Sequence, residues 1–390
     1  MAKTIYKKKI KNDKEYYFYR LRHNNLKSPR DIYSLTVKGL ESKIKTITNE
    51  LDHGIANNKE CFETFLCDWL FDVHFINIKP STKERYEGIY RNYIKNSMLS
   101  RIKIKDLTSK DIQNYYNDLI KKGKTVNSII NLNKIIAPCV RYAYNNDKII
   151  KDFSKSVVLP KEDEEKKLNK IDDVQPFTLD EQKKFIAAIE GHDLEVLLIT
   201  ALNTGLRQGE LLALTWDDID VDNNTIIVNK AVKYISDVSK EGRGKYKITI
   251  QTPKSEASNR TVSIPELLTT RLKKFHLEQK ELRLKMANLY IDNKLVFCNI
   301  YGGYLDNNNV RKRYKRILVN NKIRDRKFHD LRHTYATRLF ELNEQPKTVQ
   351  SLLGHSNISI TLDTYTHVLE SMKVKAATKL NDLYSYIGAK

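Results

Sequence analysis

The stretch KFHDLRHTYATRLF, residues 327–340, decides what kind of domain this chain contains. It holds two histidines four positions apart, His329 and His333, with Arg332 between them. If the stretch is a helix, residues three and four positions apart share a face, so these three side chains lie together. Such a face suits a metal ion, a phosphate, or plain solvent.

A metal site is the first alternative, because zinc proteases carry His-Glu-x-x-His on a helix, with the glutamate as general base. Residue 330 is an aspartate instead. Arg332 would also place a permanent positive charge beside the metal. Beside a phosphodiester, the guanidinium can hold two oxygens while the imidazoles donate or relay protons. We therefore favour a phosphate site, with a zinc hydrolase using His329 and His333 as the weaker interpretation.

The bulk composition indicates a partner with many negative charges. The chain has 390 residues, enough for two or three domains, and a net charge of +21. Nucleic acid is the expected partner, and an anionic membrane surface is the lesser one. We see no membrane-spanning apolar run and no signal peptide, and four cysteines without a CxxC pair suggest reduced thiols. The sequence thus predicts a cytoplasmic protein without a cysteine-based zinc site.

Residues 1–56 are predicted to form a small basic module, a strand followed by a helix. The first fifty residues hold 13 Lys and Arg against 5 Asp and Glu. KEYYFYRLR alternates like a strand, and VKGLESKIKTITNELDHGI has helical apolar spacing. The alternative is a solvated charged tail, against which the aromatic density argues.

Residues 59–155 are predicted to form a bundle of four helices. Ser81 or Thr82 is expected to cap the second helix, and Thr108 or Ser109 the third. Residues 156–175 are charged and aperiodic, which is typical of a linker. A further domain, 176–390, is expected to open with a capping box of Thr178 and Glu181. The predicted fold class is multidomain α+β, and the last domain is mainly helical with a small antiparallel sheet.

Three further motifs in the last domain carry groups suited to phosphate chemistry. LNTGLRQGEL places Arg207 after a turn, at the start of a helix. ITIQTPKSEASNRTVSIP is expected to be a hairpin with Lys254 near its tip. LLGHSNISITLDTYTHV contains His355 and Tyr365. Taken singly, each residue has an ordinary alternative: a surface cation, or a tyrosine that packs in a core.

Taken in order, these motifs closely resemble the catalytic domain of the tyrosine recombinases, the phage integrase family, over about residues 176–385. The resemblance assigns Tyr365 as the nucleophile and Glu210 as the acidic residue that usually follows the first arginine. His333 fits the family pattern LRHT, and its supporting role stays unassigned. The matched catalytic positions are Arg207, Lys254, His329, Arg332, His355 and Tyr365.

The resemblance implies an enzyme that cuts and rejoins DNA strands through a 3′-phosphotyrosine, without metal, ATP or another cofactor. Arg207, Arg332 and His355 would stabilise the phosphate, Lys254 would protonate the leaving oxygen and His329 would help to move the proton of Tyr365. The expected partners are double-stranded DNA at core and arm attachment sites and three further copies in a tetramer, with an excisionase or a host DNA-bending protein as an additional partner.

The layout also resembles the family, with an arm-binding module, a helical core-binding domain and the catalytic domain in order. This favours integration and excision of a mobile element, either a prophage or a conjugative transposon, in the cytoplasm of a bacterial host. A resolvase or invertase of the same family and a non-catalytic DNA-binding protein are the alternatives. The tail after Tyr365 has helical apolar spacing that suits packing on its own domain or on a neighbouring protomer.

Overall fold

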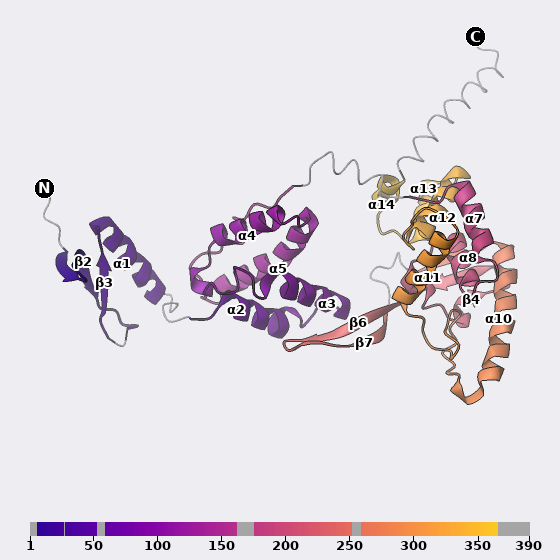
Figure 1. The fold of residues 1–390 in the computed structure, drawn as a ribbon, viewed down its shortest axis with the longest axis horizontal. Coiled ribbons are helices and arrows are strands. Elements are labelled where there is room, and N and C mark those ends of the chain that lie inside the picture. Colours follow the sequence, from indigo (N-terminus) through magenta and orange to yellow (C-terminus); the bar gives the residue numbers. More distant parts are fainter. Residues whose placement is uncertain (1–5, 27, 53–58, 162–174, 252–258, 366–390) are drawn as a thin grey trace, which may run out of the picture. The chain divides into compact units, whose positions relative to one another are not determined.

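The computed structural model describes residues 6–26, 28–52, 59–161, 175–251 and 259–365. The chain divides into two compact units (Figure 1). The first comprises Met1–Glu162 together with Ser236–Lys245, and the second comprises Asp163–Ile235 together with Tyr246–Lys390. Within the described ranges, no helix combines the length and the apolar character that crossing a membrane requires.

The N-terminal part of the first unit is a three-stranded antiparallel sheet with one helix. Strands β1 (Lys7–Lys11), β2 (Lys14–Leu21) and β3 (Arg30–Ser34) lie in that order, and helix α1 (Val37–Asp52) follows. Leu21 and Ile32 of the sheet and Leu40 and Leu51 of the helix are buried together. The predicted strand and helix are thus confirmed, and the charged-tail alternative is wrong.

The rest of the first unit contains the four predicted helices. These are α2 (Phe62–Asp68), extended by a π-helical turn η1 (Trp69–His74); α3 (Pro80–Ile89), extended by η2 (Tyr90–Ile94); α4 (Ser109–Lys121); and α5 (Val126–Asn145). A short 3-10 turn, η3 (Ile104–Asp106), precedes α4. Their apolar faces form a core of their own, so the predicted bundle is confirmed.

The helix caps in this bundle were only partly predicted. Thr108, one of the two predicted candidates, caps α4, and it also exchanges hydrogen bonds with Asp111. The predicted cap of α3 at Ser81 or Thr82 is wrong: the N-cap is Lys79, and Pro80 occupies the first helical position. Proline suits that position, because its missing N–H would have no partner there anyway.

The first unit also includes the tip of a hairpin made of β6 (Ala231–Ser239) and β7 (Gly242–Gln251). Arg243 Nε lies 2.5 Å from Glu87 Oε2, and the Glu87 side chain is only 4% exposed. Val238 packs against the apolar core of the bundle. Residues from the hairpin tip therefore complete both the core and the charge balance of the helical bundle.

The second unit is mainly helical around a small sheet of order β4-β5-β8. Its strands are β4 (Ile219–Asp220), β5 (Thr225–Val228) and β8 (Arg260–Ser263). Its helices are α7 (Leu179–Ile189), α8 (Glu195–Thr204), α9 (Gln208–Leu211), η4 (Trp216–Asp218), α10 (Glu266–Met286), η6 (Ala287–Leu289), α11 (Asn307–Asn320), α12 (Asp330–Glu341), α13 (Pro346–Leu353) and α14 (Ile358–Thr364). The predicted capping box of Thr178 and Glu181 is confirmed at the start of α7.

The predicted hairpin over residues 248–265 is wrong. Strand β7 pairs with β6, whereas β8 pairs with β5, so the two expected arms belong to different sheets. Val262 of β8 lies opposite Ile226 of β5, and both side chains are fully buried in the main core. That burial draws β8 to β5. Lys254, the predicted catalytic lysine, lies outside the described residues.

Candidate active site

Helix α12 carries the motif with which the sequence analysis began. It starts at Asp330, and His329 is its N-cap residue. The rings of His329 and His333 are perpendicular, with centroids 4.8 Å apart, which confirms that the two histidines share a face. Arg332 instead points into the protein and is 2% exposed. The predicted common face of all three side chains is therefore only partly correct.

Arg332 ties together the ends of two other helices. Its Nη1 donates to the carbonyl of Gly205 at 2.8 Å, and its Nη2 donates to the carbonyl of Leu353 at 2.6 Å. These carbonyls lie at the C-terminal ends of α8 and α13, where the helix dipole is negative and favours a cation. Burial, followed by the charge of Arg207, lowers the pKa of Arg332 to about 9, so it remains cationic at neutral pH.

Arg207 is the more accessible arginine of the site, with 39% of its side chain exposed. It lies at the N-cap of α9, as predicted. Its Nη1 donates to Glu210 Oε1 at 2.8 Å, and its backbone N–H donates to Glu210 Oε2 at 2.9 Å. Because the backbone N–H of Arg207 already donates to Glu210, it is not free to bind an anion. The guanidinium of Arg207 is therefore the group that can contact an anion here.

Arg260 is a residue of this site that the sequence reasoning missed. It comes from β8, and only 5% of its side chain is exposed. Its Nη2 lies 2.9 Å from Glu210 Oε2, and its Nε donates to the carbonyl of Leu352 at 2.7 Å. Burial alone would raise the pKa of Glu210, but Arg260 and Arg207 hold it below its usual value. The signal in the sequence was the arginine in NRTVSIP, residues 259–265.

His355 follows Gly354, which ends α13 in the left-handed conformation with a φ of 66°. The His355 backbone N–H donates to the carbonyl of Gln350 at 3.2 Å, and its Nδ1 lies 2.9 Å from Thr361 Oγ1. These contacts orient the ring and leave Nε2 for another partner. Asn357 caps α14 through its side chain, which accepts from the backbone N–H of Ser359.

Tyr365 is buried at the end of α14 and is 1% exposed. Its ring packs in a small apolar cluster with Phe340. Its hydroxyl lies 2.9 Å from Nδ1 of His333. Burial raises the pKa of the phenol, and the charge of Arg332 opposes that rise. Tyr365 thus packs in a core and also directs its hydroxyl to the predicted site.

The three site histidines are neutral at neutral pH. Burial and nearby cations lower the pKa of His333 to about 3 and that of His355 to about 4. The pKa of His329 is lowered to about 4 by desolvation, then by Arg332 and Arg207.

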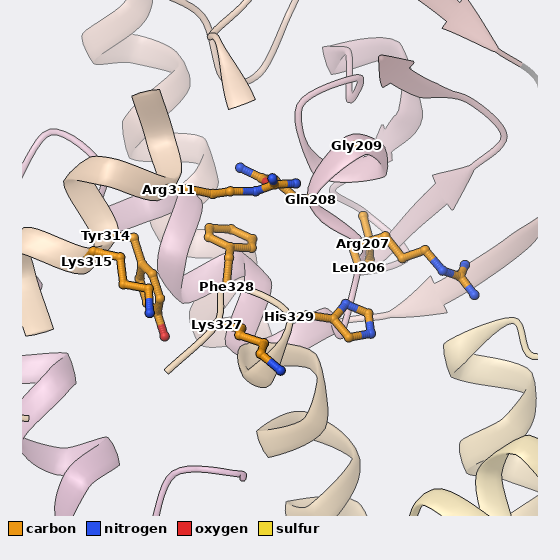
Figure 2. A pocket seen from close by; sticks show the side chains of 10 residues that line it. All are labelled: Leu206, Arg207, Gln208, Gly209, Arg311, Tyr314, Lys315, Lys327, Phe328 and His329. Carbon is orange, nitrogen blue, oxygen red and sulfur yellow. The ribbon is translucent and has the colours of Figure 1, made fainter. Parts of the chain in front are cut away.

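A cavity of about 490 Å³ is lined by Arg207 and His329, among other residues. These two residues are distant in the sequence but lie at the same end of the cavity (Figure 2). Three more basic side chains line it: Arg311, Lys315 and Lys327. Among the residues that the structure describes, no group of three histidine, cysteine or acidic side chains is arranged to hold a metal ion. The cavity therefore suits an anion.

Comparison with known proteins identifies the family. Residues 175–372 match the phage integrase family, and residues 61–120 match its N-terminal SAM-like domain. A protein of Caldanaerobacter subterraneus subsp. tengcongensis described as tyrosine recombinase XerC-like is 40% identical over 388 residues, which cover 96% of this chain and 98% of that protein. The integrase of Staphylococcus phage L54a is 27% identical, over 88% of this chain and 99% of its own.

Solved structures show the same fold. The Tn1549 transposon integrase in complex with transposon right end DNA matches with a TM-score of 0.61 at 22% identity, over 80% of this chain and 99% of that chain. A lambda integrase dimer bound to a core site matches with a TM-score of 0.56 at 18% identity, over 93% of this chain and 96% of that chain. Together with the sequence matches, these results show that the chain belongs to the phage integrase family and is a tyrosine recombinase that carries out site-specific DNA strand exchange.

Proposed function

We propose that this recombinase integrates and excises a mobile DNA element, with Tyr365 as the nucleophile. The observation that carries the proposal is the convergence of Arg207, Arg332 and His355 from separate segments with the hydroxyl of Tyr365. Cations clustered around a buried hydroxyl repel one another and lose hydration, which destabilises the folded protein. A bound anion would offset this repulsion, so the cluster is suited to an anionic substrate.

The proposed roles follow from exposure and free hydrogen-bond donors. Arg207 offers an accessible guanidinium to the non-bridging oxygens of the scissile phosphate. Each Nη of Arg332 donates one hydrogen bond to a carbonyl at a helix end, and these bonds hold the guanidinium in place. Its positive charge can therefore stabilise the phosphate without a rearrangement of the side chain. His355 presents Nε2, because Nδ1 is engaged by Thr361.

In the proposed reaction, the Tyr365 oxygen forms a bond to phosphorus, and the bond from phosphorus to the 5′-oxygen breaks. The product is a 3′-phosphotyrosine and a 5′-hydroxyl, whose proton we assign to Lys254 as general acid. A 5′-hydroxyl of the partner strand reverses the step. The energy of the phosphodiester is kept in the ester, so no ATP or metal is required by this scheme.

Integration and excision are favoured over resolution by the relatives and by the N-terminal module. Relatives include an integrase of phage L54a and a transposase from transposon Tn916. In the module, Lys9 and Lys11 share one face of the sheet and lie over the rings of Phe18 and Tyr33, which gives a basic surface suited to a second DNA site. Resolution or inversion within one replicon, by a recombinase of the same family, is the second candidate.

We further propose that the active form is a tetramer on two DNA sites, with arm sites for residues 1–56 and core sites for residues 59–155. The linker 156–175 would join them to the catalytic domain 176–390. An excisionase or a host DNA-bending protein would set the direction, in the bacterial cytoplasm.

The decisive experiment uses a nicked suicide substrate made from DNA that flanks the gene for this chain. The wild-type protein should become covalently attached, in chelator as well as without it. Tyr365→Phe should bind the DNA but form no adduct. Absence of an adduct with wild-type protein on every flanking segment would refute the proposal, and loss of the adduct in chelator that zinc restores would favour the hydrolase.

A recombination assay separates the two candidate functions. Two attachment sites on different molecules should be joined if the protein is an integrase. Reaction restricted to two sites on one molecule would favour a resolvase or invertase instead.

A further inference from the structure

The hydroxyl of Tyr365 has one described side chain within hydrogen-bond reach, and that side chain is His333. The distance from Nδ1 to Oη is 2.9 Å, and the two ring centroids lie 5.8 Å apart. Phe340 packs on Tyr365 at 5.5 Å and offers no polar atom. The phenol is therefore oriented by an apolar wall and by a single imidazole nitrogen.

His329 is placed differently, although the sequence made it the equal or better candidate. Its ring lies edge-on to His333 and borders the cavity with Arg207. His329 is exposed, whereas His333 is half-buried between His329 and Tyr365. The order in space is thus Tyr365, His333, His329, and then the basic cavity.

We propose that His333, and not His329, positions the hydroxyl of Tyr365 and accepts its proton when the phenol attacks the scissile phosphate. The inference rests on the proposed recombinase chemistry. The neutral imidazole accepts at Nδ1 and carries its own hydrogen on Nε2, so proton transfer gives an imidazolium and a phenolate oxygen that bonds to phosphorus. The 5′-oxygen leaves with a proton from the general acid, and the imidazolium later returns its proton to Tyr365 when the ester is resolved.

The charges around His333 make this base dependent on substrate. Besides burial, its neighbours His329, Arg332, His355 and Lys327 lower the pKa of His333 in the DNA-free protein, and of these Arg332 and Lys327 carry a charge at neutral pH. A phosphodiester bound among Arg207 and Arg332 brings a negative charge that opposes this field. His333 then becomes basic enough to take a proton only while the phosphate is present, which protects the nucleophile from premature reaction.

The first test measures single-turnover adduct formation by the full chain on the nicked substrate. His333→Ala should slow adduct formation by about 100-fold or more, the range for loss of a general base, while DNA binding stays intact. His333→Gln keeps a hydrogen-bonding side chain that cannot take a proton, so it should fold like the parent and be equally slow. A wild-type rate in His333→Gln would overturn the inference.

The second test asks whether the defect concerns the proton of the nucleophile. A fluorinated tyrosine at position 365 has a more acidic phenol, so it should restore much of the rate lost in His333→Ala. It should restore little in His329→Ala. In the control Phe340→Leu, which changes packing on Tyr365 but removes no base, the rate should not respond to phenol acidity. If fluorinated tyrosine restored the rate in His329→Ala but not in His333→Ala, His329 would be the residue that accepts the proton of Tyr365.

A third arm separates acid from base. A substrate with sulfur at the 5′-bridging position has a leaving group that needs no proton, so the His333→Ala defect should persist on it. Disappearance of the defect would mean that His333 serves the leaving group. If wild-type protein forms no adduct at all, the recombinase proposal fails. If wild-type protein forms the adduct and the His333 variants form it at the same rate, this inference alone fails.

Discussion

Glu210 is a buried carboxylate held between Arg207 and Arg260, and its neutralisation determines how the site is built. Ion pairs removed from water stabilise little by themselves, but a buried charge that loses its partner is strongly destabilising. The side chains of Arg260 and Glu210 are equally well buried, whereas that of Arg207 reaches solvent. We infer that Arg260 neutralises Glu210 so that Arg207 remains available to a phosphate.

Replacing Arg260 by methionine should therefore destabilise the second unit by about 3 kcal/mol, because Glu210 is left with one partner. Glu210→Gln in the same chain should recover most of that loss, since the amide needs no counter-charge. Urea unfolding followed by fluorescence measures both. The chain has two tryptophans, so a Trp69→Phe background leaves Trp216 to report on the second unit. Equal destabilisation with and without Glu210→Gln would contradict this account.

The lowered pKa values of His333 and His355 predict how stability depends on pH. The unfolded histidines titrate near 6.5, whereas the folded ones titrate at about 3 and about 4. The unfolded chain therefore binds more protons between these values, so stability is highest above pH 6.5 and falls towards pH 4. Urea midpoints of the second unit between pH 7 and pH 4.5 should decline, and His333→Gln with His355→Gln should flatten the slope. An unchanged slope in the double variant would show that other groups are responsible.

Sequence alone predicted most residues of the proposed site, because Arg207, His329, Arg332, His355 and Tyr365 lie in local motifs. It could not show that Arg332 turns inward, since its partners Gly205 and Leu353 are distant in the chain. The contact of His333 with Tyr365 bridges 32 positions and was likewise invisible. Long-range packing, not local pattern, supplies this information.

Gly205 joins two elements of the site. It ends α8 with a φ of 61°, and its carbonyl accepts from Arg332. An added Cβ would lie 2.5 Å from Cδ1 of Tyr335 and 3.1 Å from a methyl group of Leu353. The close approach of α8, α12 and α13 therefore requires glycine for both its backbone conformation and its size.

Gly205→Ala should destabilise the second unit by about 2–4 kcal/mol, from left-handed strain together with overpacking. Gly191→Ala is the matched control: its φ is 71°, but no heavy atom lies within 4 Å of the added Cβ. It should lose only about 1 kcal/mol, the strain alone. Thermal unfolding in the Trp69→Phe background compares them. If the two losses are equal, packing around Gly205 is looser than described.

Helices in this chain were easier to predict than strand pairing. Helical caps such as Thr108 and Thr178 are local and were recognised. The pairing of β8 with β5 is set by the burial of Val262 against Ile226 in the main core, whereas β7 pairs with β6 through a short turn at Lys240 and Glu241. Alternation marks a strand, but it does not name its neighbour.

Over the whole molecule, the chain passes between the two units three times: after Glu162, after Ile235 and after Lys245. The last two passages are the strands of the β6–β7 hairpin, whose tip belongs to the first unit. There, Arg243 pairs with the buried Glu87, and Lys240 pairs with exposed Asp68 and Asp72.

Arg243→Ala should lower the stability of the first unit by about 1–3 kcal/mol, because the buried carboxylate of Glu87 loses one of its partners and keeps Arg91. Lys240→Ala is the control, since its ion pairs are solvent-exposed and should matter little. A Trp216→Phe background leaves Trp69 to report on this unit. Equal effects of the two changes would mean that Glu87 does not depend on the hairpin.

The membership of the hairpin tip in the first unit has a practical consequence for dividing this protein into pieces. An N-terminal fragment that ends in the linker 156–175 would contain every helix of the bundle. It would still lack Val238, which packs against the core, and Arg243, which pairs with Glu87. Supplying residues 231–251 as a separate peptide should restore what the cut removes. The helical bundle is thus encoded in two places, and recombination between homologous genes at the linker would exchange only part of it.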